Sequence, residues 1–244
     1  LVEDEDRVWL SLLLRVRDDE QREWQAQLER ARALELAEEE RAPRMLMQLN
    51  AFLARFPDKA AVADAVTTLV APHSKMAEAQ FALAQAHLNA RNATVALKAI
   101  DIAEQRKPGW PQAAILKSQI LREQSEDKAR EYLESYVAKY PAVNEVRVTL
   151  ARLLVVQKSY LSAREQFRTA MKYDPRDTEL PYAVGLLAQQ IEDYADAEVQ
   201  FKRVLELSPA DANPVRFNLG VVAEARKQPD DAVTWYRAVT SGEY

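Results

Sequence analysis

The chain has 244 residues and a formal net charge of -5, with 48% hydrophobic and 29% charged residues. This composition is typical of a core-forming chain rather than a disordered one, and the acidic balance disfavours nucleic acid as the main partner, because phosphate binding needs a basic surface. The absence of cysteine excludes disulfides and thiolate metal sites, and no apolar run approaches the roughly 20 residues of a membrane span.

The N-terminal third, residues 1–76, is predicted to form several short helices. One amphipathic face runs over 8–16 and a second over the charge-rich stretch 18–40, and two shorter helices are expected over 46–56 and 60–71. We interpret this region as N-terminal helices that form a degenerate repeat or a cap. A helix that dimerises or binds a partner is the alternative.

From residue 77 onward the sequence repeats at steps of 33 to 35 residues. Four residue series keep this step: one of alanines, one of leucine or valine, one of large apolar residues and one of prolines. Their members are Ala96, Ala129, Ala163, Ala197 and Ala232; Leu83, Leu116, Leu150, Val184 and Leu219; Ile100, Leu133, Phe167, Phe201 and Tyr236; and Pro108, Pro141, Pro175 and Pro209. A repeat of this length, with only 4 glycines in the chain, predicts stacked helix pairs.

Each repeat is expected to contain two antiparallel helices joined by a short polar turn. The alanine is needed where the two helices cross most closely, and the proline ends the second helix because it disfavours the α conformation before it and lacks an amide donor. Asp127, Asp193 and Asp230 lie in the polar turns, where a carboxylate can cap the second helix.

The spacing and identities resemble the tetratricopeptide repeat, whose 34-residue signature has a small residue at position 8, alanine at 20, an aromatic at 24 and proline at 32. Gly185, Ala197, Phe201 and Pro209 match it in one repeat, and Gly220, Ala232 and Tyr236 match it in the next. The resemblance implies an all-α fold, a right-handed α-solenoid of antiparallel helix pairs. We expect five units, at 77–109, 110–143, 144–177, 178–212 and 213–244.

The sequence departs from this signature in several places. The family's tryptophan position holds Gln80, Ala113, Arg147, Pro181 and Arg216, and the small position 8 of the second unit holds Lys117. We therefore expect local packing of a different kind at these positions. The fifth unit has Tyr244 where a proline would fall and no polar capping helix follows, so further repeats or another subunit are expected to cover this end.

No motif of catalysis or cofactor binding is present in the sequence: there is no Gly-rich phosphate loop, no paired-histidine zinc helix and no nucleophile elbow. His87 falls at a helix position that is apolar in the other repeats, which favours a packed core histidine over a metal or catalytic one. His73 follows a proline and is interpreted as part of a connector. We therefore expect no enzymatic activity, no cofactor and no metal.

The resemblance implies that the first helices of successive repeats line a concave groove that binds peptides. Apolar anchors alternate there with amides and arginines, a mixture that suits an extended or helical peptide. The candidates are Phe81, Gln85, Asn89, Ser118, Arg122, Arg152, Tyr182, Gln189, Phe217, Asn218 and Val221. As alternatives, Arg122 and Arg152 could form intramolecular salt bridges and Asn218 could cap a local turn.

The function expected from this resemblance is that of a non-enzymatic scaffold or adaptor that binds protein or peptide partners. The fifth unit is also similar to repeat lipoproteins of proteobacterial envelopes, which implies an adaptor that delivers substrates to a periplasmic carboxy-terminal processing protease. The alternatives are an assembly factor for a pilus, secretion or polysaccharide machine, and the regulatory repeat region of a longer enzyme. The favoured location is the bacterial periplasm, with an outer-membrane anchor upstream of residue 1, and the cytoplasm is the alternative. Homo-oligomers could form through the N-terminal helices.

Overall fold

The computed structural model describes residues 51, 55, 57–208 and 212–240, and that part of the chain is helical without a β-strand. The chain divides into two compact units, Leu1–Ala129 and Arg130–Tyr244. The helices expected over 8–16 and 18–40, and most of the one over 46–56, lie outside the described residues. Among the described helices, none combines the length and apolar character that a membrane crossing requires.

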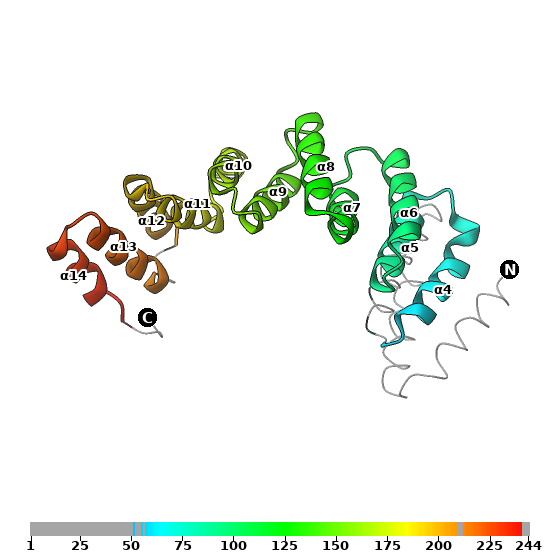
Figure 1. The fold of residues 1–244 in the computed structure, drawn as a ribbon, viewed down its shortest axis with the longest axis horizontal. Helices are drawn as coiled ribbons and strands as arrows, with labels where there is room; N and C mark the ends of the chain where they lie inside the picture. Colours follow the sequence, from blue (N-terminus) through cyan, green and yellow to red (C-terminus); the bar gives the residue numbers. More distant parts are fainter. Residues whose placement is uncertain (1–50, 52–54, 56, 209–211, 241–244) are drawn as a thin grey trace, which may run out of the picture. The chain divides into compact units, whose positions relative to one another are not determined.

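In the first unit, successive helices pack on one another in chain order (Figure 1). The elements are α4 (Lys59–Val70), a 3-10 turn (Ala71–His73), α5 (Ala77–Asn89), α6 (Ala93–Arg106) and α7 (Pro111–Gln124). The helix expected over 60–71 is confirmed as α4, and His73 lies in the connector. Between α5, α6 and α7 lies a core built around Phe81, Ile100 and Ile120.

The second unit continues the same pattern, and α8 (Glu126–Lys139) crosses into it from the first unit. The helices that follow are α9 (Asn144–Val156), α10 (Tyr160–Tyr173), α11 (Glu179–Gln190), α12 (Tyr194–Leu207), α13 (Asn213–Ala225) and α14 (Pro229–Arg237). From α9 onward each helix packs against the next one along the chain. The prediction of an all-α fold of stacked antiparallel helix pairs is therefore confirmed, and we call the first helix of each pair helix A and the second helix B.

The alanine and proline series play the structural parts expected of them. Every alanine of the series is at most 3% exposed, so the A and B helices have no room for a longer side chain at these points. Helices α6, α8, α10 and α12 each end two residues before the proline of the series. The sequence period is thus set by steric contact at one end of helix B and by a backbone stop at the other.

Four of the short turns between helices A and B use a left-handed residue that is not glycine. In the third pair, Lys158 has φ 58°, and the amide of the next residue, Ser159, donates to the Leu154 carbonyl over 2.8 Å. This bond ends helix A and satisfies one of its free carbonyls. The left-handed residues of the described turns are Arg91, Lys158, Glu192 and Lys227.

We predict that Lys158→Gly stabilises the protein. A side chain in the left-handed region costs about 1–2 kcal/mol, whereas glycine adopts that region freely and loses about 0.5–1 kcal/mol in unfolded-state entropy. The expected gain in unfolding free energy is therefore about 0.5–1 kcal/mol, measured by urea denaturation. Glu131→Gly, in the exposed middle of α8, is the control and should cost about 0.5–1 kcal/mol. A loss of stability in both variants would contradict this account of the turn.

Two of the residues that replace the family's tryptophan make the same kind of hydrogen bond. Gln80 and Arg147 are buried, and each donates a side-chain N–H to a backbone carbonyl six residues earlier: Gln80 to Ser74 at 2.8 Å and Arg147 to Pro141 at 2.9 Å. A long polar side chain therefore ties the incoming loop to the start of helix A. The expectation of a different local packing holds at these two positions.

Lys117, at the small position of the second unit, turns toward the preceding helix B. Its Nζ lies 2.8 Å from both Asp101 Oδ1 and Glu104 Oε2 on α6. Burial disfavours the charged form of Lys117, but these carboxylates outweigh it and raise the pKa of the ammonium group. The lysine thus binds two neighbouring helices together.

Of the three predicted aspartate caps, one is confirmed. Asp193 is the N-cap of α12 and accepts a hydrogen bond from the Asp196 amide at 3.3 Å. Asp127 and Asp230 are not caps, because α8 begins at Glu126 and α14 at Pro229, which places both carboxylates inside the first turn. Proline is favoured at the first helical position, and this shifts the start of α14 toward the N-terminus.

Candidate functional site

In the second unit, helices α11 and α13 present candidate binding residues on neighbouring A helices. Tyr182 and Gln189 lie on one face of α11 with Leu186 between them, which is 41% exposed. Phe217 and Val221 occupy the matching face of α13. We call Tyr182, Leu186, Gln189, Phe217, Asn218 and Val221 the α11–α13 surface.

Asn218 connects the two halves of this surface. Its Nδ2 donates to the Tyr182 hydroxyl oxygen at 3.3 Å and to the Pro214 carbonyl at 2.8 Å. Its side chain therefore does not cap a turn, the alternative considered from the sequence, because both bonds join it to helices. The contact fixes the Tyr182 ring beside α13.

Each ring of the α11–α13 surface rests on the aromatic residue of the B helix in its own pair. The ring centroids are 5.9 Å apart for Tyr182 and Phe201 and 5.8 Å apart for Phe217 and Tyr236. The Tyr236 hydroxyl donates to Glu224 Oε2 at 2.7 Å, and burial together with this carboxylate raises the pKa of Tyr236 to about 12. Tyr182 and Phe217 are only partly buried, so part of each ring stays on the surface.

Arg152, on helix A of the third pair, is a solvent-exposed cation. Its guanidinium lies 3.7 Å from Glu179 Oε2, and the two side chains are 69% and 82% exposed. The intramolecular salt bridge considered for it therefore exists, but an exposed pair of this kind contributes about 0–1 kcal/mol. It leaves the guanidinium accessible to solvent.

The candidate residues of the first unit are placed differently. Phe81 is 7% exposed and stacks on Trp110 with a centroid distance of 4.9 Å, and Ser118 is 5% exposed and donates to the Ile115 carbonyl. Both side chains therefore belong to the interior of the unit. Gln85 is half-buried, whereas Asn89 and Arg122 are exposed.

His87 is a core residue, as its helix position predicted. It is 8% exposed, and its Nε2 lies 2.9 Å from the Thr67 hydroxyl. Burial lowers the pKa of the imidazole by disfavouring its charged form, and the nearby Asp64 opposes this. Among the described residues, no group of three or more His, Asp or Glu side chains is placed to hold a metal ion.

Comparison with known proteins identifies the repeat. The model of the family described as "Tetratricopeptide repeat" matches residues 81–144, 148–212 and 182–243. No curated protein matches the sequence.

Solved structures share the fold at low sequence identity. A MamA protein is 13% identical with a TM-score of 0.56, and the match covers 66% of this chain and 88% of that one. PilF from Pseudomonas aeruginosa is 14% identical with a TM-score of 0.57, covering 80% and 89%. YrrB, described as a TPR protein with an unusual peptide-binding site, is 18% identical with a TM-score of 0.55, covering 71% and 89%.

Proposed function

Because the chain belongs to the tetratricopeptide-repeat family, we propose that it is a scaffold that binds a segment of a partner protein on the α11–α13 surface. The repeat is generally a non-catalytic fold for protein interaction, and such arrays provide extended binding surfaces. The mechanism is the positioning of partner proteins.

The observation that carries the proposal is the combination of apolar and polar groups on adjacent A helices. Leu186 is 41% exposed, the rings of Tyr182 and Phe217 are partly exposed, and Asn218 donates to the Tyr182 hydroxyl. Rings that are held by packing lose little entropy when a ligand covers them. Partly exposed anchors of this kind supply binding energy without rearrangement of the helices.

The same surface indicates the chemistry of the partner segment. Its apolar side chains would cover Leu186 and Val221, and its backbone amides and carbonyls would meet the side-chain amides of Gln189 and Asn218. Both nitrogen-bound hydrogens of Asn218 have partners within the protein, so its Oδ1 is the atom that can accept from a ligand. A segment with apolar residues at intervals is therefore the expected ligand.

Selection from a library of random peptides against the full chain tests this function. We expect selected peptides to crosslink to a benzophenone amino acid placed at Leu186. The control position is Leu161 on α10, which is 62% exposed and lies on a B helix. Crosslinking at Leu161 but not at Leu186, or a selection that yields no binding peptide, would contradict the proposal.

The finer roles expected from the sequence are distinguished by the native partner. A processing protease or its substrate would support the envelope adaptor, and components of a pilus, secretion or polysaccharide machine would support the assembly factor. A catalytic domain in the same full-length protein would support the regulatory repeat region. Crosslinking from Leu186 in the cells of origin, followed by mass spectrometry, identifies the partner.

A further inference from the structure

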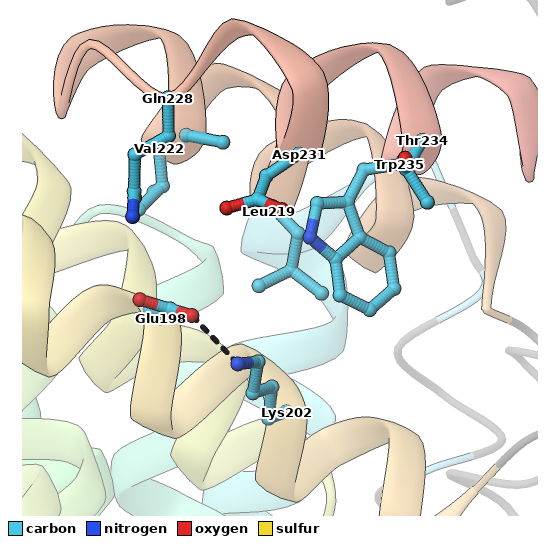
Figure 2. A pocket seen from close by; sticks show the side chains of 9 residues that line it. Glu198, Lys202, Leu219, Val222, Gln228, Asp231, Thr234 and Trp235 are labelled. Atoms are coloured by element: carbon cyan, nitrogen blue, oxygen red, sulfur yellow. Dashed lines mark hydrogen bonds and ion pairs between the residues drawn. The ribbon is translucent and has the colours of Figure 1, made fainter.

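A cleft of ≈ 170 Å³ lies between α12 and α14, with Leu219 and Val222 of α13 at its floor (Figure 2). Glu198 and Lys202 line it from α12, and Asp231 and Trp235 line it from α14. Figure 2 shows Asp231 and Trp235 extending from α14 toward α12. Since a water occupies about 30 Å³ in the liquid, the cleft has room for a planar group of several atoms.

Between the preceding two B helices, α10 and α12, arginine side chains occupy the space that corresponds to this cleft. Arg164 and Arg168 of α10 stand 34 residues before Glu198 and Lys202 in the repeat, and Asp196 of α12 stands 35 residues before Asp231. Arg168 lies 2.7 Å and Arg164 3.5 Å from Asp196. The aspartate of that pair is therefore held by two guanidinium groups.

The Arg164 guanidinium, which occupies this space between α10 and α12, is well enclosed. The Arg164 side chain is 13% exposed, as is that of Asp196, and Arg164 also lies 2.7 Å from Asp193. The Arg164 guanidinium lowers the pKa of the Asp193 carboxyl by donating a hydrogen bond to it. The fold thus accommodates an arginine side chain between successive B helices.

Between α12 and α14 the arginine is replaced and the aspartate is retained. Glu198 stands at the position of Arg164, and it pairs with Lys202 at 2.6 Å and with Arg226. These two cations are therefore occupied by Glu198. Asp231 makes no ion pair with any residue that the structure describes, although its equivalent Asp196 makes two.

A second substitution adds an aromatic wall to the cleft. Trp235 takes the place of Gln200, which in the preceding pair donates to Asp196 at 3.1 Å. Tryptophan is the best of the aromatic side chains at binding a cation over its ring face. A carboxylate and an indole four residues apart on one helix therefore border the space that a guanidinium fills in the preceding pair.

We propose that this cleft binds an arginine side chain of a partner protein, with the guanidinium between the Asp231 carboxylate and the Trp235 ring. Arginine fits better than lysine because its planar group both stacks on an aromatic face and donates in a fork to a carboxylate. The site is distinct from the α11–α13 surface, because it is lined by α12 and α14 with Leu219 and Val222 of α13, and none of its lining residues belongs to that surface. It is thus independent of the function proposed above.

The indole N–H signal of Trp235 in ¹⁵N-labelled full chain, assigned with Trp235→Phe, is the test. N-acetylarginine methylamide is the probe, and the citrulline analogue, which has the same shape without the charge, is its control. We expect the arginine probe to shift the signal to saturation, with an effect that weakens as salt is raised, because exposed charges are screened. The citrulline analogue should give no saturable shift. No shift with the arginine probe, or equal shifts with both probes, would overturn the proposal.

Two variants locate the site. Asp231→Asn should weaken probe binding about fivefold, since it removes a charge-assisted contact, whereas Asp230→Asn, at the neighbouring exposed carboxylate outside the cleft, should leave it unchanged. Glu198→Arg should abolish the response by placing an arginine where Arg164 stands in the preceding pair. Unchanged binding by either Asp231→Asn or Glu198→Arg would contradict the assignment.

Discussion

Phe201→Ala is expected to destabilise the second unit by about 3–5 kcal/mol, the usual cost of removing a buried phenylalanine ring. Phe201 is 0% exposed, and its ring fills the space beside Gly185, where an added Cβ would lie 2.7 Å from the ring. Its removal leaves a cavity between α11 and α12 and takes away the support of Tyr182. Urea denaturation followed by circular dichroism measures the loss.

The control for this prediction is Val199→Ala on the same helix. Val199 is 61% exposed, so its truncation should change the unfolding free energy by less than about 0.5 kcal/mol. Repeat arrays can unfold in parts. In Phe201→Ala, the second unit should therefore unfold at a lower urea concentration than it does in the wild type. Equal stability of the two variants would show that Phe201 is not a central part of the core.

Ala197→Leu is expected to cost about 1–3 kcal/mol through overpacking. Ala197 is 0% exposed and belongs to the same core cluster as Ala188 and Leu219. A leucine there would force α12 away from its neighbours or force a strained rotamer. The thermal unfolding midpoint and the urea denaturation curve should both shift downward.

Ala195→Leu provides the matched comparison for Ala197→Leu. Ala195 lies two residues earlier on α12 and is exposed. Because leucine and alanine both favour helices, this control should alter stability by no more than about 0.5 kcal/mol. If the two variants behave alike, Ala197 is not the point of close helix contact and the assigned repeat register is wrong.

The helical repeat was predictable because its strongest constraints act on single positions. Alanine is required where helices touch, and proline stops helix B, so both leave a period that is visible without coordinates. The exact helix starts were less predictable, as Asp230 shows, because a cap and a first-turn acid look alike in sequence. The tethers made by Gln80 and Arg147 could not be predicted, since their carbonyl partners depend on the path of the loop.

The candidate surface was only partly predictable, because exposure depends on neighbouring helices. Phe81 and Tyr182 occupy the same repeat position, yet Phe81 is 7% exposed and Tyr182 is half-buried. The Trp110 ring covers Phe81, whereas Tyr182 meets Asn218 across the surface. Position in the repeat sets the direction of a side chain, but the neighbouring repeat sets its exposure.

The cleft between α12 and α14 is not among the sites predicted from the sequence, although the sequence contains a signal for it. Aligning the repeats places Glu198 against Arg164 while Asp231 stays aligned with Asp196, so one repeat reverses a charge without changing its partner. The meaning of that reversal depends on the Arg164–Asp196 ion pair, which links two successive B helices. Periodicity alone does not reveal that contact.

The central claim is that the α11–α13 surface binds partner segments, and the dissociation constant of a selected peptide tests it most directly. Calorimetry would compare the wild type, the Leu186→Glu Val221→Glu double variant and the Leu161→Glu control. We expect the double variant to bind about tenfold or more weakly, because buried anchors at the centre of an interface carry most of its energy, and we expect the control to bind like the wild type. Unchanged affinity in the double variant, with its helical circular dichroism intact, would contradict the claim.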